Sequence, residues 1–198
     1  MQILAKTRPI IDKIFSVLSS KHLTWFIILF FTFQALWVAI SFARMIYDEG
    51  FHFGIISIYT NHWWPVIYDQ PESYDRFRDF AGEGSKLFHY LLSFPQRLFD
   101  FMGIGRGESI LLHRLINIGM VVGGLYFFVR LFDLLKVKRL YTNITLAITT
   151  SLPILVMVAA TVNYDNGLFL LSPLFFIYFV KIVQNRRINW VDLTLLSV

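Results

Sequence analysis

Apolar runs long enough to cross a bilayer recur along the sequence. In the first, from 23 to 43, no charged residue interrupts the chain between His22 and Arg44. At the rise of an α-helix this run would reach about 30 Å, the thickness of the hydrocarbon core. Further apolar runs lie at 109–132, 140–164 and 166–183, and a fifth begins at Trp190. The pattern predicts an all-α fold, a polytopic transmembrane helix bundle that forms one domain over 23–198.

The last apolar run is cut short at the end of the sequence. Val198 follows Trp190 too closely for a complete span, since a crossing helix needs about 20 residues. We therefore expect four complete membrane helices here. We also expect further helices, either beyond Val198 or on a partner subunit.

The distribution of charge indicates how the predicted helices are oriented. The long connection 45–108 is mostly acidic, whereas the segment before the first run and the loops after the second and fourth runs are basic. The basic positions are Lys6, Arg8, Lys13, Lys21, Lys136, Lys138, Arg139, Lys181, Arg186 and Arg187. The positive-inside rule places the N-terminus in the cytoplasm and 45–108 outside the membrane.

Two regions outside the predicted spans show apolar residues at helical spacing. In the N-terminal segment 1–22 these are Ile10, Ile11, Ile14, Phe15 and Leu18. In the outer segment they are Phe51, Ile55, Ile58 and Tyr59, and then Leu87, Tyr90, Leu91 and Phe94. The first pattern predicts an amphipathic helix on the cytoplasmic surface. The others predict short interfacial helices within 45–108, joined by a loop at 68–84.

The composition limits which kinds of functional site and partner the protein can have. Hydrophobic residues make up 56% of the 198 positions, with 21 Phe. There is no Cys, so disulfides, thiolate metal sites and cysteine nucleophiles are excluded. The formal charge of +5 would suggest a nucleic-acid partner in a soluble protein. Here it is explained by the basic loops, and we expect membrane lipids and no nucleic acid as partners.

The first group of candidate residues follows the first predicted span. Asp48 and Glu49 are adjacent carboxylates at the outer face, and near a low-dielectric surface their repulsion favours a proton on one of them. His52 lies one helical turn further on. The pair could serve as an acid or base, but an ordinary acidic helix end would have the same sequence.

The second group lies at other points that reach the outer face. Asn163, Tyr164 and Asp165 form a tight turn between the third and fourth spans, where Asp165 or Asn166 could simply cap a helix. His113 and Arg114 lie one to two turns inside the second span, where Arg114 could hold a lipid phosphate or extend to the interface.

The remaining polar and small residues of the second span suggest structural roles. Arg130, near the cytoplasmic end, is expected to extend to the interface. Gly119, Gly123 and Gly124 indicate close helix packing and no chemistry.

The order of these parts resembles a known group of enzymes. The acidic pair within 47–53, the stretch Leu87-Phe88-His89-Tyr90-Leu91-Leu92 and the turn Val162-Asn163-Tyr164-Asp165-Asn166 look like the N-terminal half of a GT-C glycosyltransferase. That group includes protein mannosyltransferases and aminoarabinose transferases, and the chain is most similar to its DUF2142-type bacterial members. Such members usually have nine or more membrane helices.

The resemblance implies a function at the outer face of a bacterial cytoplasmic membrane. The reaction would transfer a sugar from a polyprenyl-phosphate donor to an acceptor. Asp48, with Glu49 beside it, would match the family's acidic residue, which acts as a base or as a ligand of a divalent cation. Asp165 would match a second acidic group, and the substrate-binding candidates are His52, His113, Arg114, Asn163, Tyr164 and Asp165.

Two non-enzymatic functions are alternatives. One is a transporter or flippase-like protein in which His113 and Arg114 line a passage. The other is a scaffold subunit of a membrane complex. Polar groups gather at the outer rim of the predicted helices and are sparse at their middles, which favours surface chemistry on a lipid-linked substrate.

Overall fold

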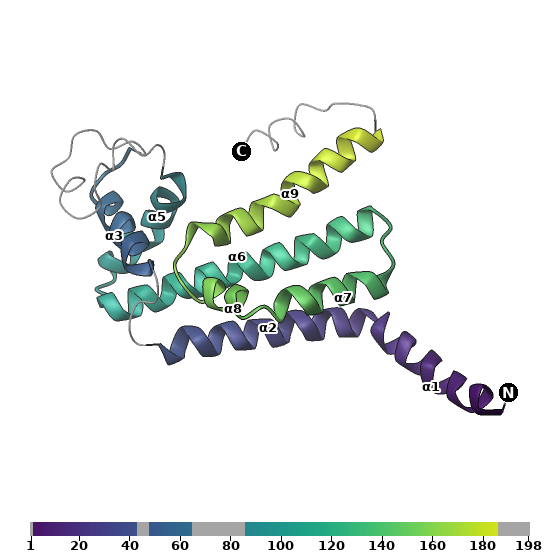
Figure 1. Ribbon diagram of the computed structural model, residues 1–198. Helices are drawn as coiled ribbons and strands as arrows, with labels where there is room; N and C mark the ends of the chain where they lie inside the picture. Colours follow the sequence, from purple (N-terminus) through teal and green to yellow (C-terminus); the bar gives the residue numbers. More distant parts are fainter. Residues whose placement is uncertain (1, 43–47, 65–85, 186–198) are drawn as a thin grey trace.

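Helices form every regular element of the part of the chain that the computed structural model describes, residues 2–42, 48–64 and 86–185 (Figure 1). The helices are α1 (Gln2–Leu18), α2 (Lys21–Ser41), α3 (Glu49–Thr60), α5 (Leu87–Phe101), α6 (Arg106–Leu134), α7 (Arg139–Thr150), α8 (Pro153–Ala159) and α9 (Tyr164–Asn185). The predicted loop at 68–84 and the run from Trp190 lie outside the described residues.

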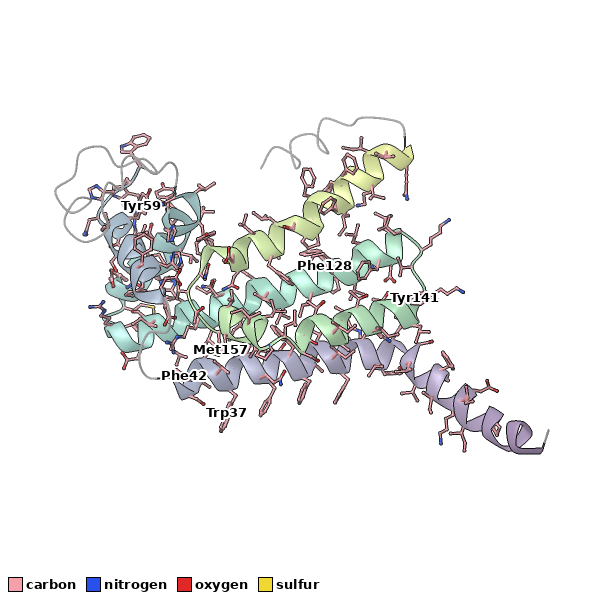
Figure 2. The ribbon with its side chains drawn as sticks, in the orientation of Figure 1. Trp37, Phe42, Tyr59, Phe128, Tyr141 and Met157 are labelled. Carbon is pink, nitrogen blue, oxygen red and sulfur yellow. The ribbon has the colours of Figure 1, made fainter. Side chains whose placement is uncertain are left out.

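Three of these helices, α2, α6 and α9, are long and apolar enough to cross a membrane. The α7–α8 pair makes a fourth if it is counted as one span. This confirms the all-helical fold and the helices predicted near 23–43, 109–132 and 166–183; that they cross a membrane stays a prediction. Large apolar side chains also project from the side of α2 that points away from the bundle. Trp37 is one of them, with 67% of its surface exposed (Figure 2). Such a surface is typical of a helix that contacts lipid or another protein.

The single helix predicted over 140–164 is broken into two helices. Helix α7 ends at Thr150, α8 begins at Pro153, and their axes differ by 73°. Proline has no N–H to donate to the Thr149 carbonyl, and the backbone N–H of Leu152 donates to that carbonyl instead, at 3.3 Å. The hydroxyl of Ser151 donates to the Ala147 carbonyl at 2.6 Å, in addition to the Ser151 N–H that donates to the same carbonyl at 3.0 Å.

The long helices pack around a single apolar core. Its buried members come from α2, α6, α7 and α8: Ile28, Phe31, Ala35, Ala39, Ile118, Val121, Leu125, Val129, Leu146 and Ala159, with Ala160 just after α8. Helix α9 lies along α6, where Gly123 and Gly124 face Leu170 and Phe169. A Cβ on Gly124 would come within 2.7 Å of the Phe169 carbonyl oxygen. Close packing is therefore confirmed at these two glycines, whereas Gly119 faces open space.

A buried asparagine fastens the start of α2 to α7. Asn143 is 1% exposed; its amide donates to the carbonyls of Leu18 and Ser20, and its oxygen accepts from the Thr24 hydroxyl at 2.6 Å. Helix α1 extends from this junction away from the bundle (Figure 1). Its apolar face, from Ile10 to Val17, is exposed. The amphipathic helix is confirmed, and its position on a cytoplasmic surface stays a prediction.

Helices α3 and α5 pack against each other beside the first turns of α6, at one end of the bundle (Figure 1). The Arg97 guanidinium of α5 donates to the Tyr59 carbonyl at 2.8 Å and to the His62 carbonyl, and it lies 4.1 Å from the Trp63 ring. Both helices match the patterns in the outer segment. Their placement in a headgroup layer stays a prediction.

Candidate functional site

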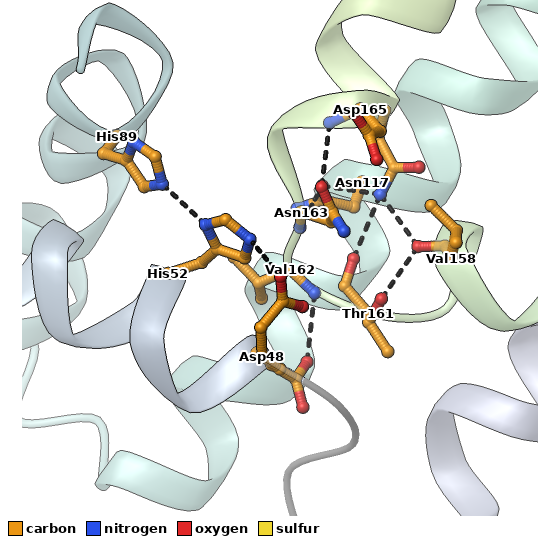
Figure 3. A network of polar contacts seen from close by, with 11 residues as sticks. Asp48, His52, His89, Asn117, Val158, Thr161, Val162, Asn163 and Asp165 are labelled. Atoms are coloured by element: carbon orange, nitrogen blue, oxygen red, sulfur yellow. Dashed lines mark hydrogen bonds and ion pairs between the residues drawn. The ribbon is translucent and has the colours of Figure 1, made fainter. Parts of the chain in front are cut away.

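The side chains of Asp48, His52 and His89 form a row that crosses the contact between α3 and α5. The Asp48 carboxylate lies 3.1 Å from Nε2 of His52, and Nδ1 of His52 lies 2.8 Å from Nε2 of His89 (Figure 3). Asp48 directly precedes α3 and His52 follows one turn later, so their side chains share a face of the helix. The Asp48 side chain is 57% exposed, whereas His52 and His89 are buried, with 2% and 4% of their surfaces exposed.

Aromatic contacts fix the orientation of the two imidazoles. The rings of His52 and His89 stack with centroids 5.1 Å apart. The Tyr164 ring, at the start of α9, meets His52 edge-on at 5.4 Å, and Phe88 meets His89 in the same way at 5.5 Å. The structure therefore brings the turn before α9 to the acidic end of α3.

An apolar cavity of about 550 Å³ adjoins this row of side chains. His52, Lys86, His89 and Tyr164 supply its polar lining. The other lining residues are Phe51, Leu87, Phe88, Leu91, Leu92, Met120, Gly167, Leu168, Leu170 and Leu171. A hollow of this size with few polar groups is typical of sites for small or amphiphilic ligands.

His89 is held neutral in this setting. Burial, followed by the charges of His52 and Lys86, lowers the pKa of His89 to about 3, against a smaller upward effect of the Lys86 backbone. Its Nδ1 is buried and has no side-chain hydrogen-bond partner among the described residues. At neutral pH the ring therefore carries one proton, and only its Nε2 engages another side chain.

Glu49 points away from the row formed by Asp48, His52 and His89, contrary to its predicted role as a second catalytic carboxylate. It is fully buried and forms a two-pronged ion pair with Arg114, at 2.8 Å from Nε and 2.7 Å from Nη2. Its Oε1 also accepts the backbone N–H of Val162 at 3.1 Å. The neighbours Asp48 and Glu49 thus have separate surroundings, and Glu49 joins α3 to α6 and to the turn before α9.

Arg114 is neither at the cavity nor extended to an interface, the two roles that the sequence left open. It is 3% exposed, and its Nη1 donates to the carbonyls of Ala39 and Phe42, both at 2.7 Å. These carbonyls belong to the end of α2, where a helix carries partial negative charge. Arg114 therefore caps α2 and neutralises Glu49.

His113 is also a core residue. It is fully buried between the rings of Phe53 and Phe99, and its Nε2 lies 3.0 Å from Oε1 of Gln96. Gln96 in turn donates to Asp100 at 2.7 Å. His113 does not line the cavity, so the structure does not bring it together with His52 and Tyr164.

The turn before α9 is ordered by asparagines. Asn163 is the capping residue, since its side-chain oxygen accepts the N–H of Asp165 at 2.9 Å; the expectation that Asp165 or Asn166 caps this helix is wrong. Asn166 is buried and donates to Asn117 and to the carbonyls of Val158 and Thr161. Asp165 is exposed, and its carboxylate contacts no other side chain in the described part of the protein.

His89 and Lys86 are the site residues that sequence reasoning missed. The stretch around His89 was noted as a motif and read only as an interfacial helix. A polar ring in the middle of an apolar stretch was the available signal, since such a ring needs a partner when it is buried. Its partner lies 37 positions earlier in the chain, which the local pattern could not reveal.

The described residues include no group of three or more His, Asp or Glu side chains placed to hold a metal ion. Comparisons of the chain with protein-family models, with curated proteins and with solved structures found no match.

Proposed function

We propose that this chain forms the outer-face active site of a polytopic membrane glycosyltransferase. The enzyme would transfer a sugar from a polyprenyl-phosphate donor to an acceptor hydroxyl, in the cytoplasmic membrane of a bacterium with the N-terminus inside. The observation that supports the proposal best is an exposed carboxylate one hydrogen bond away from the lining of an apolar cavity. The cavity suits the hydrocarbon of a lipid-linked substrate, and the carboxylate suits the removal of a proton.

Asp48 would be the general base. It accepts the proton of the acceptor hydroxyl, whose oxygen attacks the anomeric carbon of the sugar. The bond between that carbon and the phosphate oxygen breaks, and polyprenyl phosphate departs with the electron pair. The exposed Asp48 side chain can meet an incoming hydroxyl, whereas the buried Glu49 cannot.

Lys86 takes the role that Arg114 had in the sequence-based hypothesis. The developing negative charge on the leaving phosphate needs a cation nearby, and Lys86 lines the cavity. Arg114 is committed to Glu49 and to the end of α2. The same contacts argue against transport, because a passage lined by His113 and Arg114 would have to open a tightly packed and hydrogen-bonded core.

The test uses the full-length protein, including any helices beyond Val198 and any partner subunit, reconstituted in liposomes that contain a polyprenyl-phosphate sugar, with consumption of the donor as the readout. Asp48→Asn keeps the shape and removes the negative charge, so we expect a loss of transfer of about 10²- to 10⁴-fold, the usual contribution of a general base. Glu108→Gln, an exposed acid in the first turn of α6, is the matched control and should retain activity.

Either of two results would refute the proposal. One is a full-length wild-type protein, with any helices beyond Val198 and any partner subunit present, that is folded in the liposomes and consumes no donor. The other is an Asp48→Asn variant that transfers sugar as fast as the wild type.

A further inference from the structure

The two histidines behind Asp48 carry information about proton positions. An exposed carboxylate is ionised at neutral pH and has only acceptors to offer. Nε2 of His52, at 3.1 Å from that carboxylate, must therefore carry a proton. If His52 is neutral it has one N–H, so its Nδ1 is then an acceptor. In that state the proton in the 2.8 Å contact between the rings comes from Nε2 of His89.

We propose that His89 is a positioning residue that locks the tautomer of His52, so that His52 holds the Asp48 carboxylate ready to act as a base. The inference rests on the proposed function for its catalytic meaning, although the tautomer itself can be observed without turnover. The logic is that of other triads, in which a third group orients the residue behind the reacting one. Here the reacting group would be the carboxylate, and both supporting groups are imidazoles.

The arrangement is costly for a purely structural contact. Two imidazoles are almost completely buried, and Nδ1 of His89 has no side-chain partner in the described part of the chain. Two apolar side chains would fill the same space without burying polar atoms. The edge contacts from Tyr164 and Phe88 further restrict rotation of the rings, as an orienting role requires.

The surroundings of the two rings keep His89 neutral. Among the described residues, the titratable groups that face the rings are Asp48 before α3, Lys86 before α5 and Tyr164 at the start of α9. Burial, followed by the charges of His52 and Lys86, opposes a second proton on His89.

The experiment measures the protonation of ring nitrogens directly. The full chain, labelled with ¹⁵N-histidine and held in detergent micelles, is studied by long-range proton–nitrogen correlation NMR at neutral pH. We expect Nε2 of His52 to be protonated and its Nδ1 to be bare. His89→Leu removes the donor and should convert His52 to a mixture of tautomers. His89→Gln places an amide N–H near the same point and should restore the single tautomer.

Transfer activity supplies a second readout. His89→Leu should lower kcat by about 10- to 100-fold with little change in KM, the usual effect of losing an orienting partner, and His89→Gln should recover most of the loss. If the leucine variant does not fold, the spectrum of the wild type and the glutamine variant still test the tautomer.

The outcomes separate this inference from the proposed function. A wild-type His52 with its proton on Nδ1 would overturn the inference, as would a folded His89→Leu variant with unchanged tautomer and activity. A tautomer that shifts with His89→Leu in a chain that consumes no donor would support the positioning role and refute the transferase.

Discussion

The ion pair between Glu49 and Arg114 is the contact whose removal should cost this fold most. It joins four separate parts of the chain, because Glu49 also accepts the Val162 N–H while Arg114 caps α2 through the carbonyls of Ala39 and Phe42. Replacing Arg114 by Met fills a similar volume and removes every one of its donors. The variant leaves a fully buried carboxylate without its cation.

The magnitude follows from the burial of both partners. Removing one member of a buried ion pair costs about 3–5 kcal/mol, because the other charge stays in a low-dielectric interior. We expect Arg114→Met and Glu49→Gln each to lose about this much free energy of unfolding. Arg114→Lys keeps the charge but cannot reach both carboxylate oxygens and the end of α2, so a loss of about 1–3 kcal/mol is expected.

Unfolding by SDS in mixed dodecylmaltoside micelles, followed by tryptophan fluorescence, measures these losses. Arg130→Met is the matched control, since Arg130 is an exposed arginine on the same helix and should change stability by less than about 0.5 kcal/mol. The double variant Glu49→Gln, Arg114→Met should lose less than the sum of the two single losses. Single variants as stable as the control, or a fully additive double variant, would refute the coupling described here.

Three further predictions concern other parts of the molecule. Gly124→Leu should force α6 and α9 apart and lower stability by about 1–3 kcal/mol in the same micelles, whereas Gly119→Leu, in open space, should not. Because the folded protein lowers the pKa of His89 from 6.5 to about 3, its neutral ring contributes stability that is complete above pH 6.5 and declines as the pH falls toward 3. Stability measured between pH 7 and pH 4 should therefore fall less in His89→Gln than in the wild type. In this chain without native cysteine, Asn61→Cys should react with an impermeant maleimide in intact cells and Lys138→Cys should not; the opposite labelling would reverse the proposed orientation.

The helices themselves could be predicted from the sequence, because their signals are local. An apolar run of about 20 residues has few stable states other than a helix, and it needs no distant partner to be recognised. The same holds for the amphipathic α1 and for the helical spacing in α3 and α5. Close packing at Gly123 and Gly124 also follows from composition, since only residues without a side chain let two backbones approach so closely.

The break between α7 and α8 was within reach of the sequence but was not predicted. Pro153 was visible near the middle of the apolar run, and proline in a helix interior either kinks or ends it. A kinked span and two helices at 73° share the same local sequence. In the structure the Thr149 carbonyl, which proline leaves without its usual donor, accepts the Leu152 N–H instead.

The roles of the polar residues were decided by tertiary structure alone. Asp48 and Glu49 are adjacent in sequence, yet one is exposed and paired with His52, and the other is buried and paired with Arg114. A carboxylate takes its character from the charge and solvent around it, and for Glu49 those come from α6 and from the turn before α9, dozens of positions away. The sequence thus determined which segments are helical and which polar groups lie near one end of them. Only the folding of α3 against α5, α6 and α9 decided which groups line the cavity and which hold the bundle together.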